Sequence, residues 1–334
     1  MSFGWGPPAC RRDRASLRLT DRVPDRALML LDTASLYFRA YFGVPDTLRS
    51  PDGAPVNAVR GLLDFIARLV GEHSPGAVVA CWDNDWRPAW RVALLPSYKA
   101  HRVVAEVATD TDVEVTPDPL AAQVPVIRET LTRLGVPVVG AAEHEADDVI
   151  GSLATQADRP VDVVTGDRDL FQLVDDDRDV RVLYTAQGVG RLEVVDAARV
   201  RARYGVEPRQ YADFAALRGD PSDGVPGVRG VGDKTAASLL AAHDDLRGIL
   251  RAAAAGTGPA GSQARRLAAA SDYPSVAPTV VGVARDLGLS SESVQLSAWD
   301  EHRRAGWDEH VERWGLGGSA ARAVHALAPL RPVG

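Results

Sequence analysis

Cysteine is scarce in this sequence, and long uncharged apolar runs are missing. Two cysteines, Cys10 and Cys81, occur in 334 residues, too few for a disulfide framework, so a reducing cytoplasmic compartment is expected. No apolar stretch reaches membrane-spanning length without a charge, and the opening MSFGWGPPACRRDR lacks the apolar centre of a secretory signal. We therefore expect no membrane partner.

An excess of basic charge, typical of nucleic-acid-binding proteins, is also absent. The formal net charge is −7. The distribution matters more than the sum, because assigning nine clustered carboxylates to bound metal changes −7 to +2. The overall charge therefore does not exclude a nucleic acid partner.

Residues 1–27 are rich in arginine and have no apolar periodicity, so we expect a disordered extension. The second methionine, Met29, lies in the first apolar run, which leaves open a true start downstream of residue 1.

Short apolar runs then alternate with helical patterns, which predicts a mostly parallel α/β sheet. The expected strands are 28–31, 77–82, 136–139 and 161–165, and the expected helices are 33–42, 55–72, 117–135 and 145–156. A hairpin is expected from 180–184 and 191–194. Helices follow at 197–204, at 210–217 and after residue 240, with a loose segment at 255–262.

Carboxylates stand where three of these strands end. Asp32 and Asp83 each follow a strand, and Asp167 and Asp169 follow a third. Open α/β sheets bind ligands at that edge. An aspartate is also a common helix N-cap, and acids at a helix start complement the helix dipole. That explanation covers one or two of Glu145, Asp147 and Asp148, but three so close repel one another.

A glycine-rich stretch, GDPSDGVPGVRGVGDKT, spans residues 219–235 and precedes a predicted helix. Its backbone N–H groups and the helix N-terminus suit a phosphate, and Asp220 and Asp223 suit a hard cation. It is not a P-loop, because Asp233 separates Gly232 from Lys234. A plain surface loop between two helices is the alternative.

Basic and aromatic residues mix between residues 86 and 102, a pattern that suits phosphate contact with base stacking. They are Trp86, Arg87, Trp90, Arg91, Tyr98, Lys99 and Arg102. An ordinary solvated face with core aromatics is the alternative. The following run, 103–115, is acidic and rich in Val and Thr, and we expect it to be flexible.

So many acids on one sheet edge require a cation to stay ionised, and oxygen ligands without His or Cys favour Mg²⁺ or Mn²⁺. Two ions about 3.5–4 Å apart would assist both oxygens of a phosphoryl displacement. Lys99 and Arg102 could neutralise charge that develops on the phosphate.

Six collinear segments over about residues 28–250 resemble the 5′-nuclease family, which includes bacterial 5′–3′ exonucleases, the N-terminal domain of DNA polymerase I and flap endonucleases. The segments are LLDTASLYFRAYF, the strand that ends at Asp83, YKAHR, EADDVIGSLA, VTGDRDLFQLV and GDPSDGVPGVRGVGDKTA. The resemblance implies a PIN-like α/β nuclease domain (28–198), a helical arch near 98–118, and a helical C-terminal subdomain (199–334) with a helix–hairpin–helix-type motif.

The resemblance also implies roles for individual residues. The first metal site would use Asp32, Asp83, Glu145 and Asp147, and the second Asp148, Asp167, Asp169, Asp220 and Asp223. Lys99 and Arg102 match the catalytic basic pair of the arch. DNA contacts are expected from Arg91, Tyr98, Gly224, Val225, Gly227, Val228, Gly230, Val231, Gly232, Lys234 and Thr235, with K⁺ bound at the motif.

The implied function is a 5′–3′ exonuclease and 5′-flap endonuclease with two Mg²⁺ or Mn²⁺ ions, acting in replication and repair. Its expected partners are DNA with 5′ ends or flaps and RNA primer–DNA hybrids, and we expect a nucleoid-associated monomer. No polymerase-sized segment follows residue 250, so a free-standing nuclease is expected. The alternatives are a non-catalytic DNA-binding protein of the same fold and a PIN-like RNA endonuclease.

Overall fold

The computed structural model describes residues 26–105, 112–257, 262–270, 272–289 and 294–332. All but two residues of the predicted extension 1–27, and residues 258–261 of the predicted loose segment 255–262, lie outside these ranges. Within them, no helix is both long and apolar enough to cross a bilayer.

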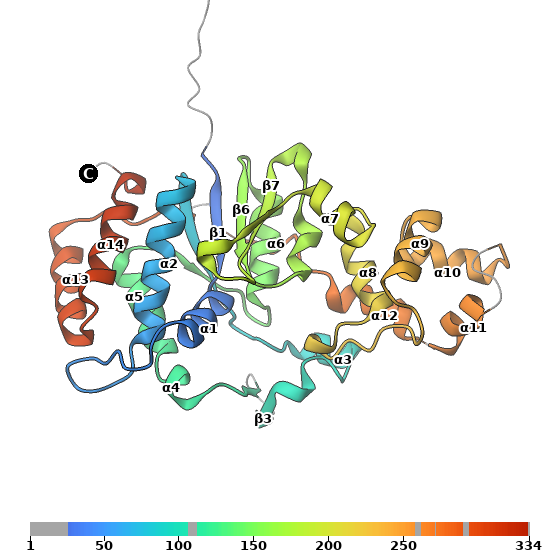
Figure 1. The fold of residues 1–334 in the computed structure, drawn as a ribbon, viewed down its shortest axis with the longest axis horizontal. Coiled ribbons are helices and arrows are strands. Elements are labelled where there is room, and N and C mark those ends of the chain that lie inside the picture. The colour runs from blue at the N-terminus through green and yellow to red at the C-terminus, as the bar shows by residue number, and fades with distance from the viewer. Residues whose placement is uncertain (1–25, 106–111, 258–261, 271, 290–293, 333–334) are drawn as a thin grey trace, which may run out of the picture.

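A six-stranded sheet forms the centre of the molecule, in the order β5-β2-β1-β6-β7-β8 (Figure 1). The first five of these strands run parallel and β8 is antiparallel to β7, so the mostly parallel sheet and the hairpin are confirmed. Their bounds are β1 Leu28–Asp32, β2 Ala77–Cys81, β5 Val138–Val139, β6 Val161–Thr165, β7 Val180–Tyr184 and β8 Glu193–Val195.

Alternate strand residues enter two cores, one on each face of the sheet. Met29 and Leu31 of β1 pack with helices α1 (Thr33–Gly43), α2 (Asn57–His73) and α5 (Val124–Leu134). Leu28 and Leu30 face α6 (Ala146–Gln156) on the other side. This two-sided burial explains why the strands read as continuous apolar runs.

The single helix predicted for 117–135 is wrong, since the chain forms α4 (Asp118–Ala121) and then α5. Pro125 has no N–H to donate, and its ring would clash with the Ala121 carbonyl of a continuous helix. The flexible segment expected at 103–115 is structured at both ends, where β3 (Val103–Ala105) pairs with β4 (Val113–Glu114). Residues 106–111 lie outside the described residues.

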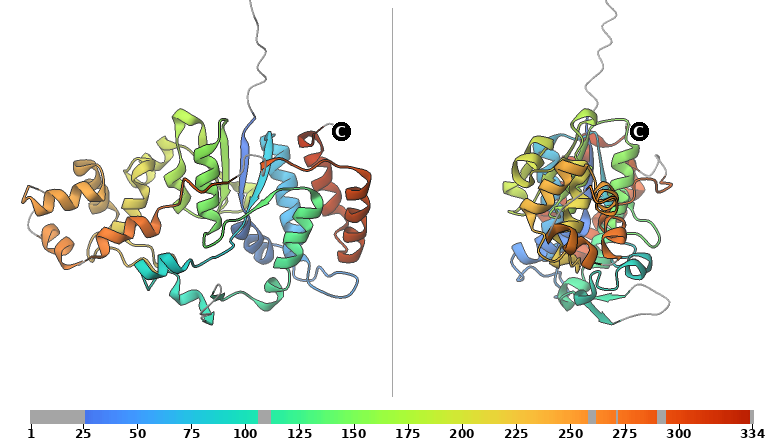
Figure 2. Two further views of the ribbon diagram at one scale, coloured as in Figure 1. Left: turned by 180° about the vertical axis from the view of Figure 1, so that it is seen from behind. Right: turned by 90° about the vertical axis from the view of Figure 1, so that its right-hand side faces the viewer.

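The C-terminal helices lie at both ends of the sheet (Figures 1 and 2). One group extends from α7 and α8 away from the sheet: α7 Ala197–Tyr204, α8 Tyr211–Arg218, α9 Asp233–His243, α10 Leu246–Ala254, α11 Ser262–Ala269 and α12 Tyr273–Val281. The chain then crosses back, and α13 (Glu301–Trp314) and α14 (Gly317–Leu327) pack on α5 and α2. The predicted domain boundary at 198/199 assigns α13 and α14 to the C-terminal subdomain, although they pack on helices of the N-terminal domain.

Candidate active site

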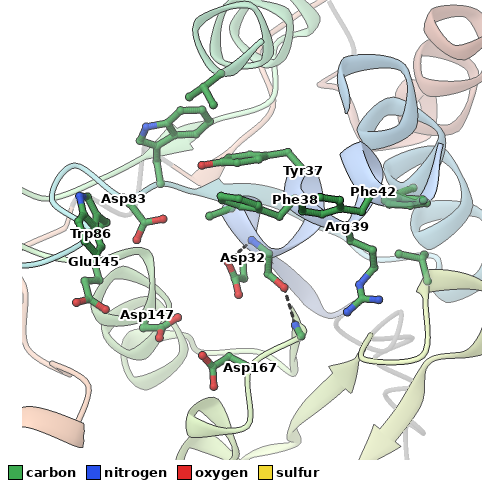
Figure 3. A pocket seen from close by; sticks show the side chains of 18 of the residues that line it. Asp32, Tyr37, Phe38, Arg39, Phe42, Asp83, Trp86, Glu145, Asp147 and Asp167 are labelled. Atoms are coloured by element: carbon green, nitrogen blue, oxygen red, sulfur yellow. Dashed lines mark hydrogen bonds between the residues drawn. The ribbon is translucent and has the colours of Figure 1, made fainter. Parts of the chain in front are cut away.

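The carboxyl ends of β1, β2 and β6 bring three acids to one edge of the sheet. Asp32 ends β1, and Asp83 and Asp167 stand two residues beyond β2 and β6. With Glu145 and Asp147 they line one open cleft of about 1040 Å³ (Figure 3). The structure therefore brings together five of the predicted acids.

Asp32 is fixed by two hydrogen bonds. Its carboxylate accepts from the backbone N–H of Ser35 at 3.1 Å and from the hydroxyl of Thr165 at 2.6 Å. Burial raises the pKa of Asp32 to about 7, with further contributions from the charges of Asp83 and Asp167. A buried carboxylate among other acids favours a nearby cation.

The N-terminus of α6 supplies two acids to the cleft. Glu145 precedes the helix and accepts hydrogen bonds from the Lys99 ammonium and the Tyr98 hydroxyl, both at 2.8 Å. The Asp83 carboxylate accepts from the backbone N–H of Ala146 at 2.8 Å, which joins β2 to this helix. The pKa of Asp147 lies well above its usual value because of burial and the charges of Asp167 and Asp32.

A second, much smaller cavity lies beside the cleft. Glu145 and Asp147 line both spaces, and Asp169 and Asp223 line only the small one. Burial and the charges of Asp167, Asp223 and Asp220 hold the pKa of Asp169 well above its usual value. The Oδ1 atom of Asp169 is buried and has no hydrogen-bond partner. That atom is suited to a bound cation or to an ordered water.

Lys99 and Arg102 also line the cleft. Lys99 is buried and has a positive φ of 49°. Burial lowers its pKa, but the charge of Glu145 outweighs this effect, so the pKa is raised well above its usual value. Arg102 donates to Asp223 at 2.9 Å and to the Ser222 carbonyl at 2.7 Å. The basic pair is therefore joined to the glycine-rich segment.

The carboxylate oxygens of the cleft fit hard divalent cations, but they do not surround a cation without added water. Among the described residues, no three Asp, Glu, His or Cys side chains form a ready-made metal-binding group. Mg²⁺ commonly takes only one or two carboxylates and keeps several waters. The buried, mutually repelling acids and the unpartnered Asp169 oxygen are consistent with such water-rich binding.

Two of the nine predicted ligands bind arginine instead and line neither cavity. Asp148 is fully buried in a two-pronged ion pair with Arg91, whose guanidinium lowers the pKa of Asp148 despite burial. Asp220 lies 3.4 Å from Arg218 and 3.5 Å from Arg168 and accepts from the backbone N–H of Ser222.

Several predicted DNA contacts are inside the protein. Arg91 is paired with Asp148, and Tyr98 is buried against Glu145, so neither side chain offers a surface for DNA. The side chains of Val225, Val228 and Val231 are buried as well. Their role is to anchor the glycine-rich segment to the hydrophobic core.

The rest of the glycine-rich segment is placed as a surface element. Gly230, Gly232 and Lys234 are exposed at the start of α9, and Thr235 is half-buried. At Gly224, a β-carbon would lie 2.0 Å from the Ser97 carbonyl, and φ is 68°. Gly227 also has a positive φ and packs against Arg218 and Gly219.

Other residues of the cleft were missed from the sequence. Thr165 orients Asp32, and Arg39, Phe42 and Glu114 line the cleft wall. The dense aromatic and basic run YFRAYF after Asp32 was an available signal, because a buried helix face alone would not need an arginine there.

Comparison with known protein families gives two matches along the chain. Residues 27–205 match the family described as "5'-3' exonuclease, N-terminal resolvase-like domain", and residues 206–303 match "5'-3' exonuclease, C-terminal SAM fold". The chain belongs to the 5′–3′ exonuclease family. The predicted enzyme class, a nuclease, and the predicted fold, a PIN-like α/β domain with a helical C-terminal domain, are confirmed.

Two relatives with the printed name 5′–3′ exonuclease match along nearly their whole length. A "5'-3' exonuclease" of Streptomyces coelicolor is 57% identical over 90% of this chain and 99% of its own. One from Mycobacterium tuberculosis is 47% identical, with 91% and 98% covered. A DNA polymerase I of Mycobacterium tuberculosis is 39% identical over 86% of this chain but 30% of its own length.

Solved structures share the fold at low sequence identity. The bacteriophage T5 5′-exonuclease with bound zinc has a TM-score of 0.59 at 15% identity, covering 91% of this chain and 99% of its own. Flap endonuclease-1 of Methanococcus jannaschii has a TM-score of 0.54 at 15% identity, with 92% and 94% covered. A T5 flap endonuclease complex contains DNA and metal ions and has a TM-score of 0.58 at 15% identity, with 91% and 99% covered.

Proposed function

We propose that this enzyme is a two-metal 5′–3′ exonuclease and structure-specific 5′-flap endonuclease that hydrolyses DNA phosphodiester bonds. The observation that carries the proposal is the convergence of five carboxylates from three strand ends and one helix start on a single cleft that also contains Lys99 and Arg102. A pair of Mg²⁺ or Mn²⁺ ions would supply an activated water and neutralise the leaving oxygen.

The residues that would hold these ions fall into two groups. Asp32, Asp83, Glu145 and Asp147 line the cleft, and Asp167 joins them there. Asp169 and Asp223 extend the set into the small cavity. Asp148 and Asp220 are left out of this set, because they pair with arginine and line neither cavity.

Lys99 and Arg102 would orient the scissile phosphate. Two interactions hold the Lys99 ammonium, with Glu145 at 2.8 Å and with the Trp86 carbonyl at 3.3 Å. An ammonium has three donors, so one remains for a phosphate oxygen. A fixed cation that faces charge developing in the transition state lowers the barrier more than a mobile one.

The start of α9 and the turn before it, with Gly230, Gly232, Lys234 and Thr235, would grip the duplex backbone. Free N–H groups at a helix N-terminus suit phosphates, and a K⁺ ion at this motif is part of the proposal. The backbone N–H of Lys99 donates to the Asp223 carbonyl at 2.9 Å. The duplex grip and the cleft are thus joined through one short segment.

DNA with 5′ ends or flaps is the proposed substrate, with RNA primer–DNA hybrids as a second substrate and a monomer as the working form. A cytoplasmic, nucleoid-associated role in replication and repair follows from these substrates. T5 flap endonuclease and the catalytic core of Rad2, a fold neighbour with a TM-score of 0.53 at 16% identity, both appear in complexes with DNA, which supports the substrate class.

The test is cleavage of an end-labelled duplex that carries a 5′ flap, with Mg²⁺ or with chelator. We expect cuts near the junction only with Mg²⁺, and stepwise products from a flap-free 5′ end. Tight binding with intact substrate in Mg²⁺ would instead favour the non-catalytic DNA-binding protein. Preferential cutting of single-stranded RNA would favour the PIN-like RNA endonuclease.

A further inference from the structure

We propose that Arg91 and Asp148 form a buried positioning pair that sets the direction of Glu145, and that Asp148 does not bind metal. The inference deepens the proposed function and rests on it, because Glu145 is one of the proposed metal-binding residues. Asp148 directly follows Asp147 in the sequence, but its carboxylate contacts Arg91 and does not line the cleft.

The hydrogen bonds of Asp148 leave no room for a metal ion. Its Oδ1 accepts from Arg91 at 2.7 Å and from the backbone N–H of Ala284 at 2.8 Å. Its Oδ2 accepts from Arg91 at 2.8 Å and from the backbone N–H of Glu145 at 3.2 Å. A carboxylate has about four lone-pair sites, and all four are used.

Arg91 joins three parts of the chain that are far apart in sequence. It belongs to α3 (Ala89–Leu94), and its side chain is 2% exposed. Beyond Asp148, its Nε donates to the Val280 carbonyl at 3.0 Å and its Nη2 to the Gly282 carbonyl at 3.2 Å. The pair therefore ties the helix before Lys99, the start of α6 and the segment that leaves α12.

The pair reaches the cleft through Glu145. Arg91 lies 3.6 Å from the Glu145 carboxylate, and Asp148 holds the Glu145 backbone N–H. Glu145 lines both the cleft and the small cavity. Losing Arg91 leaves the Asp148 charge buried with only backbone donors, and losing Asp148 leaves Arg91 with only the longer ionic contact to Glu145 and removes one hydrogen bond from the first turn of α6.

A ligand role and a positioning role make opposite predictions for Arg91. If Asp148 binds metal, removing Arg91 frees the carboxylate, so metal affinity stays the same or rises. If the pair positions Glu145, removing Arg91 lowers metal affinity as much as removing the Asp148 charge. Side chains that orient metal ligands typically change affinity or activity by about 10–100-fold when they are replaced.

The experiment compares wild type, Arg91→Met, Asp148→Asn and the double variant by calorimetric titration of Mn²⁺ into DNA-free protein and by single-turnover flap cleavage. We expect each single variant to lose about 10–100-fold in both readouts and the double variant to lose no more than either. Wild-type or tighter Mn²⁺ binding by Arg91→Met, with a loss in Asp148→Asn, would overturn the inference.

Controls separate positioning from stability. Asp162 is another buried carboxylate that pairs with an arginine, the half-exposed Arg181, on the neighbouring strands β6 and β7 and outside the cleft. Asp162→Asn should lower the melting temperature without changing Mn²⁺ affinity. If Arg91→Met does not fold, Arg91→Lys serves instead, since it keeps the charge but not the paired geometry. Wild-type Mn²⁺ affinity in Arg91→Lys would contradict the inference, whereas absent Mn²⁺ binding in wild type would overturn the proposed function itself.

Discussion

Asp169 illustrates how burial and charge combine in this cleft. It is 7% exposed, one of its oxygens has no hydrogen-bond partner, and its pKa is raised by burial and by Asp167, Asp223 and Asp220. Without a cation this carboxylate costs stability, whether it repels its neighbours or takes up a proton. The cleft is therefore a site where function and stability oppose each other.

Replacing Asp169 by Asn should stabilise the metal-free protein. The change removes a buried charge and keeps the side-chain volume, so we expect the melting temperature in chelator to rise by about 2–4 °C. The rise on adding Mn²⁺ should shrink in the variant. Scanning calorimetry with and without Mn²⁺ measures both quantities. A variant that melts lower than wild type in chelator, with an unchanged response to Mn²⁺, would contradict this assignment.

Lys99 and Lys234 should have separable roles. Lys99→Met removes one of the cations that line the cleft, so the single-turnover rate at saturating DNA should fall about 10²–10³-fold. Lys234→Met removes an exposed cation from the start of α9, so DNA binding should weaken and its salt dependence should decrease by about one phosphate contact. Single-turnover rates and DNA-binding isotherms, measured at several salt concentrations, distinguish the rate effect of Lys99→Met from the binding effect of Lys234→Met. A pure binding defect in Lys99→Met would contradict its proposed role.

The sequence predicted most of the acidic cleft because strand ends in a parallel sheet share an edge. It did not predict the partners of Asp148 and Asp220. Arg91 lies 57 residues from Asp148, and the fold, which packs α3 on α12, brings the two side chains together. An acid that faces arginine cannot be told from one that faces metal by its neighbours in sequence.

Gly224 joins the glycine-rich segment to the chain around Lys99. Its φ is 68°, and the Ser97 hydroxyl donates to its carbonyl at 2.7 Å. A side chain there would meet the Ser97 carbonyl. This contact fixes the distance between the proposed duplex grip and the cleft.

Gly224→Ala should therefore disturb the spacing between the proposed duplex grip and the cleft. We expect a loss of about 1–3 kcal/mol in unfolding free energy from strain and displacement, together with slower or shifted flap cleavage. Chemical denaturation and product mapping measure these effects. Gly71→Ala in α2 is the matched control, because its β-carbon would meet nothing within 4 Å. Wild-type stability and an unchanged cut site in Gly224→Ala would contradict the coupling.

Elements with strong local signals were predicted best. Apolar runs gave the parallel strands, and periodicity gave α1, α2 and α6 close to their observed bounds. The break between α4 and α5 was missed although Pro125 signalled it. The valines of the glycine-rich segment were assigned to DNA because a sequence does not show which side of a turn faces the core.

Helices α13 and α14 tie the end of the described chain to the first domain. His310 of α13 is buried, contacts the Thr130 hydroxyl of α5 at 2.8 Å and stacks on Trp307. Nothing local to residues 301–327 says that they pack on α2 and α5 rather than on α12. Such long-range helix pairings depend on the combined surface of several helices. The predicted division at 198/199 therefore does not include the packing of α13 and α14 on α5 and α2.

The docking of α13 should weaken in mild acid. Burial lowers the pKa of His310, although the charge of Glu129 acts in the opposite direction. The unfolded chain then binds a proton below pH about 6.5 more readily than the native state, so stability falls as pH decreases below that value. Between pH 7.5 and 5.5, the melting temperature of His310→Gln should fall less than that of wild type. Equal losses in the two proteins would show that His310 is not the group that titrates.

The proposed function requires the carboxylates of the sheet edge to bind metal. Asp167→Asn and Asp162→Asn change two aspartates at or next to strand β6, of which Asp167 alone lines the cleft. In flap cleavage with Mg²⁺, we predict that Asp167→Asn loses at least about 10³-fold in rate while it still binds the flap duplex, and that Asp162→Asn cuts like wild type. Wild-type cleavage by Asp167→Asn, or cleavage by the unmodified enzyme in chelator, would contradict the claim.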